Sequence, residues 1–161
     1  MAKKSPFITT GVVANNRKSN FDYFIEDKIE AGIMLAGTEV KSLRLGHANI
    51  SDAYASHISD SKHGDGIYLQ NFNIPMYGTS PHYQHDPLRI KKLLLHKKEI
   101  AKLVGSIQRK GYTLIPLSIY FNERGVAKVE LGLGLGKQQH DKRATEKERE
   151  WTREKNRLLK E

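Results

Sequence analysis

Two runs of alternating apolar residues in the second half of the chain constrain the fold most. Apolar or β-branched residues occupy every second position over 113–121 and again over 127–135, and the turn-forming sequence Asn122-Glu123-Arg124-Gly125 separates the runs. Successive side chains of a β-strand point to opposite faces of a sheet, so this period of two predicts a β-hairpin with one buried face. The alternating residues are Thr113, Ile115, Leu117, Ile119, Phe121, Ala127, Val129, Leu131, Leu133 and Leu135.

Shorter patterns predict further strands. Residues 23–35 mix β-branched and aromatic residues with charges, which favours a strand with a bulge or twist near Gly32. Residues 53–59 and 67–74 flank a run of turn-forming residues and predict a second hairpin. Residues 8–14 are a candidate first strand.

Two helices are expected between these strands. A short helix is predicted to start at an N-cap on Thr38 and to end at Gly46. Apolar residues from Leu93 to Ile107 keep helical spacing, and Gly111 ends the pattern. About six strands with two helices predict a mainly β fold, an antiparallel barrel of the oligonucleotide-binding (OB) type, with a sandwich as the alternative.

The composition changes sharply at Gly136, which divides the chain into a predicted barrel domain over 1–135 and a tail over 136–161. After Gly136 there are nine lysines or arginines, six acidic residues and few apolar residues. Ala144, Trp151 and Leu158 recur every seven residues, so a helix here has only a narrow apolar stripe. We therefore expect a tail that is disordered or fraying when free and helical when bound.

The charge of the chain indicates its class of partner. A net charge of +9 favours a polyanion such as RNA, DNA or an anionic membrane. There is no apolar run near the ~20 residues that cross a bilayer, and residues 1–16 lack a secretory signal, so a cytoplasmic protein is expected. The absence of cysteine excludes disulfides, thiolate catalysis and cysteine zinc sites.

Catalytic and metal patterns are weak. His82, His85 and Asp86 form the single local cluster with ligand chemistry, but their spacing matches no metal template. The alternating glycines of 132–136 fit close packing in a barrel strand better than a phosphate-binding loop. No nucleophile or carboxylate pair stands out. We therefore predict no metal, no cofactor and no enzymatic activity.

A basic run precedes the second predicted helix. Arg89, Lys91 and Lys92 lie between His85 and His96, and the run either binds RNA phosphates or merely makes the surface soluble. The RNA interpretation gains support from other cations and from polar groups that could bind unpaired bases. These are Asn16, Arg17, Lys18, Lys41, Ser42 and Arg44.

The tail begins with a distinctive segment over 136–143, in which His140 lies beside alternating charges. An imidazole can stack on bases, which is consistent with RNA binding. The alternative is an ordinary helix start capped by Asp141, followed by solubilising pairs at i, i+3 spacing. Those pairs are Glu146–Arg149, Glu150–Arg153 and Glu154–Arg157.

Several short sequences occur together in a characteristic order from about Asn16 to Trp151. They are Tyr23-Phe24-Ile25-Glu26, Glu30-Ala31-Gly32, Gly37-Thr38-Glu39-Val40-Lys41-Ser42-Leu43-Arg44, His85-Asp86-Pro87, Lys92-Leu93-Leu94-Leu95-His96, and Gly136-Lys137 with His140-Asp141-Lys142-Arg143. On these residues the chain closely resembles the SsrA-binding protein family, also called small protein B or SmpB, the bacterial partner of transfer-messenger RNA.

The resemblance implies an OB-type barrel whose one face holds the transfer-RNA-like domain of transfer-messenger RNA. Similar proteins accompany the alanine-charged RNA to ribosomes that are stalled without a usable codon, and act without a membrane. A monomer is expected. On the family pattern the RNA-binding face includes Asn16, Arg17, Lys18, Glu30, Glu39, Lys41, Arg44, Lys92, Leu94 and His96.

The tail of similar proteins occupies the empty decoding region and messenger path of the small ribosomal subunit. The resemblance implies that His140 stacks on ribosomal RNA bases and that Asp141-Lys142-Arg143 helps accommodation, with Lys137 and Trp151 as further contacts. The chain departs from the family pattern at two places. Asn20-Phe21 stands where relatives often carry a basic residue and histidine, and Gln138 replaces a common lysine.

Overall fold

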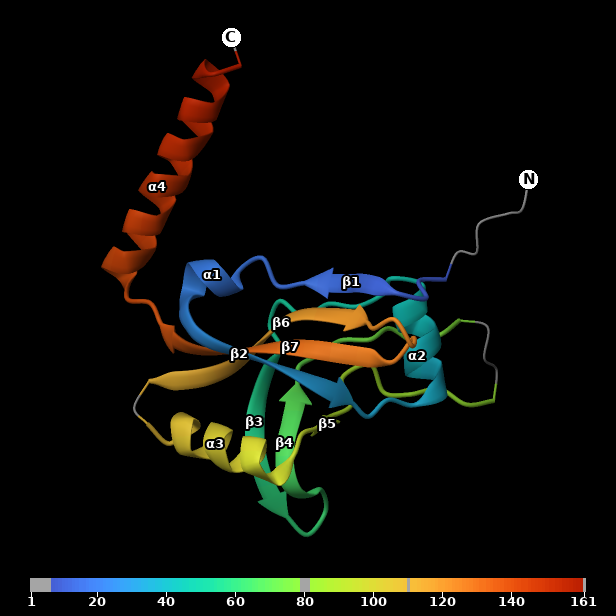
Figure 1. Cartoon of the computed structure of the whole chain (residues 1–161). Helices are drawn as coiled ribbons and strands as arrows, with labels where there is room; N and C mark the ends of the chain where they lie inside the picture. The colour runs from blue at the N-terminus through green and yellow to red at the C-terminus, as the bar shows by residue number, and fades with distance from the viewer. Residues whose placement is uncertain (1–6, 79–81, 110, 161) are drawn as a thin grey trace, which may run out of the picture.

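Six antiparallel strands close into a barrel in the computed structural model, which describes residues 7–78, 82–109 and 111–160 (Figure 1). The ring of pairings runs β6-β3-β4-β5-β2-β7 and returns from β7 to β6, while β1 pairs with β6 outside the ring. The expected mainly β, OB-like barrel is confirmed. The strands are β1 (Gly11–Asn15), β2 (Tyr23–Ile33), β3 (Tyr54–Asp60), β4 (Gly64–Gln70), β5 (Lys91–Leu94), β6 (Tyr112–Phe121) and β7 (Ala127–Gly136).

Both predicted hairpins are confirmed. β6 and β7 pair from Tyr112↔Leu135 to Phe121↔Ala127, and β3 pairs with β4 from Tyr54↔Gln70 to Asp60↔Gly64. The first strand starts at Gly11, three residues after its expected start. β2 spans most of its predicted range, but the irregularity in its pairing with β7 lies between Ile25 and Asp27 rather than at Gly32.

A bulge in β6 divides the predicted alternation. The pairing with β7 shifts between Pro116 and Ser118, so the side chains up to the shift face opposite to the predicted alternation, while those after it follow the prediction. Leu114, Ile119 and Phe121 belong to the core, whereas Leu117 packs on Gly132 from the other side of the sheet. Proline cannot donate to the ladder, and a bulge is one of the few places where a strand tolerates it.

The glycines of β7 allow close packing, as predicted, at two of the three positions. A Cβ atom on Gly132 would lie 3.1 Å from Leu117, and one on Gly134 would lie 3.2 Å from the Phe24 carbonyl oxygen. These contacts are tighter than a side chain accepts without movement of its neighbours. Gly136 has open space around its Cβ position.

The strand β5 was not predicted. Leu93 matched the spacing of the helix that follows, but it lies in β5, and the helix α3 begins only at Lys97 and ends at Ile107. In the strand, Leu93 is buried in the core, while Leu94 is half exposed. The four residues of β5 are too few for alternation to distinguish strand from helix.

Two short helices flank the barrel. α1 (Ser19–Asp22) precedes β2, and α2 (Gly37–Arg44) follows it. The predicted N-cap at Thr38 is wrong, because Ala36 caps α2 and its N–H donates to the Glu39 carboxylate at 3.1 Å. Gly46 follows the C-cap with a positive φ of 80°, as a helix terminus in the left-handed conformation requires.

The tail forms one long helix, α4 (Gln139–Leu158), with no buried residue. Figure 1 shows α4 leaving the barrel beside α1 and extending away from it. Trp151 and Leu158 of the narrow apolar stripe are more than half exposed. Among the described helices, none is long and apolar enough to cross a membrane.

Candidate nucleic-acid interface

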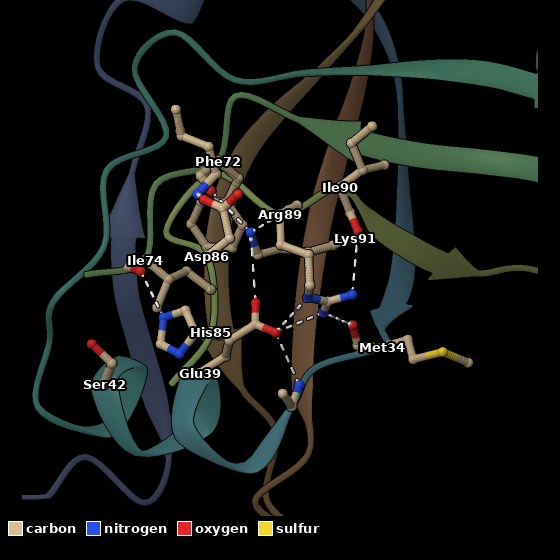
Figure 2. A network of polar contacts seen from close by, with 12 residues as sticks. Met34, Glu39, Ser42, Phe72, Ile74, His85, Asp86, Arg89, Ile90 and Lys91 are labelled. Carbon is tan, nitrogen blue, oxygen red and sulfur yellow. Dashed lines mark hydrogen bonds and ion pairs between the residues drawn. The ribbon is translucent and has the colours of Figure 1, made fainter. Parts of the chain in front are cut away.

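A cluster of three charges, two of them buried, ties α2 to β5 (Figure 2). The carboxylate of Glu39, on α2, is inaccessible to solvent. The Arg89 Nε donates to Glu39 Oε1 at 2.8 Å, and its guanidinium also donates to the Met34 carbonyl at 3.0 Å. The Lys91 ammonium lies 3.6 Å from Glu39 Oε2. Burying such charges costs desolvation, which their mutual attraction offsets, although Glu39 Oε2 accepts no hydrogen bond within the described residues.

Lys91 is completely buried. Its ammonium donates to the carbonyls of Phe72 at 3.0 Å and Arg89 at 2.7 Å, and it lies over the Phe72 ring. Desolvation by burial lowers the pKa of Lys91 to about 8, and the charge of Glu39 opposes that shift. Lys91 is therefore an internal support for the loop before β5.

Two further polar residues of the predicted interface are also inside. His85 lies with Nδ1 2.9 Å from the Thr38 hydroxyl, and its Nε2 donates to the Ile74 carbonyl at 2.8 Å. Ser42 donates to the Pro75 carbonyl at 2.7 Å. His85 thus links α2, through Thr38, to the chain at Ile74. In the described part of the chain, no three His, Asp or Glu residues are grouped to hold a metal.

The basic run over 89–92 does not form one exposed surface, because Lys91 is completely buried. Residues of a strand alternate between its faces, so Lys91 points into the core and Lys92 points outward. Arg89 is engaged by Glu39. Lys92 is the cation of this run best placed to meet a partner, and its ammonium lies 5.9 Å from the centre of the Tyr68 ring.

Cations and polar groups remain accessible around α2 and β5. Lys41 is exposed beside the Tyr77 ring, and Leu94 and His96 are exposed at the end of β5. Arg44 is half-buried, with its guanidinium over the Phe121 ring and a 3.4 Å donation to the Gly125 carbonyl. Lys41, Leu94 and His96 are therefore accessible to a partner, and Arg44 and Lys92 are partly accessible.

The other predicted residues lie elsewhere on the barrel. Arg17 and Lys18 are exposed just before α1, which Figure 1 shows at the opposite end of the barrel from α2. Asn16 is buried there and donates to the Pro116 carbonyl at 3.1 Å. Glu30 is exposed on β2 and accepts from the Tyr120 hydroxyl. The structure therefore does not gather the predicted residues into one compact patch.

The predicted tail residues follow the start of α4. Asp141 accepts from the Gln138 N–H at 3.2 Å, so it caps the helix from within the first turn, and His140 is exposed beside it. Lys137 donates to the Asn20 carbonyl at 2.8 Å, and Lys142 pairs with Asp22 at 3.2 Å. These two lysines attach α4 to α1, while the remaining predicted tail residues, Arg143 and Trp151, are exposed.

Sequence reasoning missed a second use of the tail arginines. The i, i+3 pairs predicted within α4 are not formed. In the described helix no glutamate lies within 4.0 Å of an arginine or lysine. Arg149 instead lies over the ring of Phe21, 5.5 Å from its centre. The departure from the family pattern at Asn20-Phe21 was the available signal, since Phe21 supplies an uncharged aromatic ring on which a cation can lie.

A closed antiparallel barrel with accessible cations, a buried ionic support and a charged helical tail defines a small β-barrel protein suited to a polyanionic partner. Residues 13–161 match the family described as SmpB protein. The chain belongs to the SmpB family.

Known relatives agree along nearly the whole chain. An SsrA-binding protein of Afipia carboxidovorans is 58% identical over 92% of this chain and 91% of its own length. Another, from Caulobacter vibrioides, is 53% identical over 92% and 94%. A solved structure described as "tmRNA-SmpB: a journey to the center of the bacterial ribosome" has a TM-score of 0.64 and 43% identity, covering 84% of this chain and 93% of that chain.

Proposed function

We propose that this chain binds the transfer-RNA-like domain of transfer-messenger RNA and delivers it to stalled ribosomes for trans-translation. The observation that carries the proposal is membership of the SmpB family over 13–161, together with the similarity to a solved tmRNA–SmpB assembly. The net charge of +9 supplies the long-range attraction that an RNA partner needs. The work is proposed to take place in the cytoplasm.

The barrel is proposed to bind RNA through its accessible residues. Lys41, Lys92 and His96 offer cations and an imidazole on α2, on β5 and just after β5, and Arg17 and Lys18 offer cations beside α1. Phosphate contacts of this kind position a folded RNA, while the exposed Leu94 and His96 can meet unpaired bases. Four residues of the proposed set are assigned an indirect role, since they hold the shape of this surface from inside. They are Glu39, Ser42, His85 and Lys91.

The tail is proposed to act on the ribosome. Its exposed His140 and Arg143 are available to ribosomal RNA, and Lys137, Asp141, Lys142 and Trp151 complete the proposed contacts with the decoding centre and messenger path. The division of the chain into a barrel over 1–135 and a conditionally helical tail over 136–161 belongs to the same proposal. Because α4 has no buried residue, its helix can change position on binding without breaking a packed core.

The function is proposed to be non-enzymatic, because binding and positioning of RNA give every residue of the proposed interface a role. Incubation of the purified chain with RNA and Mg²⁺ should produce no cleavage above a chain-free sample. Activity that copurifies with the chain and is lost with a point substitution would overturn this part of the proposal.

The direct test is binding. The full chain should bind the isolated transfer-RNA-like domain more tightly than an elongator transfer RNA of equal length at the same salt concentration. In cells it should be enriched on stalled ribosomes. A constant one copy per ribosome, without transfer-messenger RNA, would instead identify a structural ribosomal protein.

A further inference from the structure

A cavity of about 380 Å³ opens to solvent between the barrel and the tail, beside α1. One wall comes from the barrel domain beside α1, with Arg17, Lys18 and Phe21. The other wall is one face of α4, with Glu146, Arg149, Glu150 and Arg153 at the i, i+3, i+4, i+7 spacing that places residues on the same side of a helix. We refer to this cavity as the α1–α4 pocket.

The two walls are joined by specific contacts. Lys142 on α4 pairs with Asp22 of α1, and the Lys142 ammonium lies 5.9 Å from the centre of the Phe21 ring. Arg149 also lies over that ring, at 5.5 Å. Lys137 donates its N–H to the Asp22 carbonyl at 2.8 Å. Cation–π contacts at exposed sites are individually weak, so a ligand that contacts both walls can shift the equilibrium between docked and undocked α4.

The cations of the pocket form no direct ion pair with a carboxylate in the described part of the chain. In the described residues no carboxylate lies within 4.0 Å of Arg17, Lys18, Arg149 or Arg153. Four cations against two glutamates leave an excess of positive charge around one cavity. Cations that face one another across a cavity repel, and an anion between them relieves that repulsion.

We propose that the α1–α4 pocket binds a backbone phosphate of RNA, with one wall supplied by the core and the other by the tail. Arginine presents a planar fork of donors that matches phosphate oxygens. The exposure of these cations makes each single contact weak in water, so a free anion would bind poorly, whereas an RNA strand adds the contacts of its other phosphates. This inference rests on the proposed function, because it takes the RNA held by the barrel as its ligand.

The shared site has a consequence for the tail. A phosphate that contacts both walls binds the chain when α4 is docked beside α1, and it cannot do so when α4 has moved away from the barrel. Mass action then stabilises the docked helix as RNA binds. RNA binding by the barrel therefore orders the first turns of α4 before the chain reaches a ribosome.

The test compares two double variants of the full chain. R149A/R153A removes the tail wall of the pocket. K147A/K155A removes the same charge from the opposite face of the same helix, about 180° around the axis from the pocket arginines, and neither lysine lines the pocket. Each protein is titrated with the isolated transfer-RNA-like domain at several salt concentrations, and amide hydrogen exchange of residues 139–158 is measured with and without that RNA.

For the wild type and K147A/K155A, RNA should slow hydrogen exchange in α4. R149A/R153A should still bind RNA, but with affinity reduced several-fold, with a log–log salt slope shallower by about 0.7 to 0.9, and without the added protection of α4. If either readout of R149A/R153A equals that of K147A/K155A, the pocket does not bind RNA as proposed. Failure of the wild type to bind the RNA at all would instead refute the proposed function.

Discussion

The charges around Glu39 and the charges of α4 lie in very different surroundings. Glu39 and Lys91 are removed from water and held by several partners, whereas every residue of α4 is at least partly exposed. A buried charge that loses its partner is costly, and an exposed one is not. The comparison shows that the charges around Glu39 maintain the shape of the barrel, while the exposed charges of α4, such as Arg143 and Arg153, remain available to a partner.

The largest expected effect separates the two regions by function. Ending the chain after Gly136 removes α4 and keeps β7, because Gly136 still pairs with Tyr23. We expect peptide tagging on stalled ribosomes to be abolished, while affinity for the transfer-RNA-like domain falls by less than about tenfold, one or two phosphate contacts at most. Tagging assays and RNA titration of the same preparation check this. Equal loss of both activities would contradict a division of labour.

The next effect tests the buried cluster. Glu39→Ala leaves the Lys91 ammonium buried without its carboxylate partner and should lower the free energy of unfolding by about 3 to 5 kcal/mol. Glu123→Ala, in the exposed turn between β6 and β7, is the matched control and should change stability by less than about 0.5 kcal/mol. Denaturant unfolding measures both. A loss of unfolding free energy in Glu39→Ala no larger than in Glu123→Ala would mean that the cluster does not stabilise the fold.

A smaller effect follows from the pKa of Lys91, which is lowered from 10.5 to about 8 in the folded protein. Between these values the unfolded chain binds more protons than the folded one, so stability must rise with pH. From pH 8 to pH 10 this group should add about 2 kcal/mol to the free energy of unfolding.

The comparison with Lys91→Met isolates that contribution, because other groups titrate equally in both proteins. The pH-dependent gain of the wild type over the variant should be visible in urea unfolding at pH 8, 9 and 10. Parallel curves for the two proteins would show that the folded-state pKa of Lys91 is not lowered.

The smallest expected effect tests the accessible surface. Lys92→Ala removes an outward cation of β5 and should make the salt slope of RNA binding shallower by about 0.7 to 0.9, with affinity reduced several-fold. Lys62→Ala, at the exposed tip of the β3–β4 hairpin, carries the same charge change outside the proposed interface. Identical salt slopes for the two variants would show that Lys92 does not contact an RNA phosphate.

Much of the barrel was predictable because long alternating runs report strands directly. The β6–β7 hairpin followed from period two and a turn, and only the bulge at Pro116 displaced its core residues. β5 was missed because four residues carry little periodic signal and the apolar spacing of Leu93 continued into α3. Local pattern is weakest where an element is short.

The site was less predictable than the fold. A cluster of cations in sequence does not reveal which of them points inward, so Lys91 and Lys92 appeared equivalent although they face opposite sides of β5. Glu39 and His85 matched the family pattern, yet their contacts with Arg89 and Thr38 required the folded chain. The α1–α4 pocket joins residues more than 120 positions apart, which no local pattern could show.

The central claim is that the barrel binds transfer-messenger RNA while His140, at the start of the tail, contacts ribosomal RNA. Photo-crosslinking residues placed at position 92 and at position 140 of otherwise identical full chains, on stalled ribosomes, test it most directly. We expect the cross-links from position 92 to map to transfer-messenger RNA and those from position 140 to map to small-subunit ribosomal RNA. Cross-links from both positions to the same RNA would contradict the account.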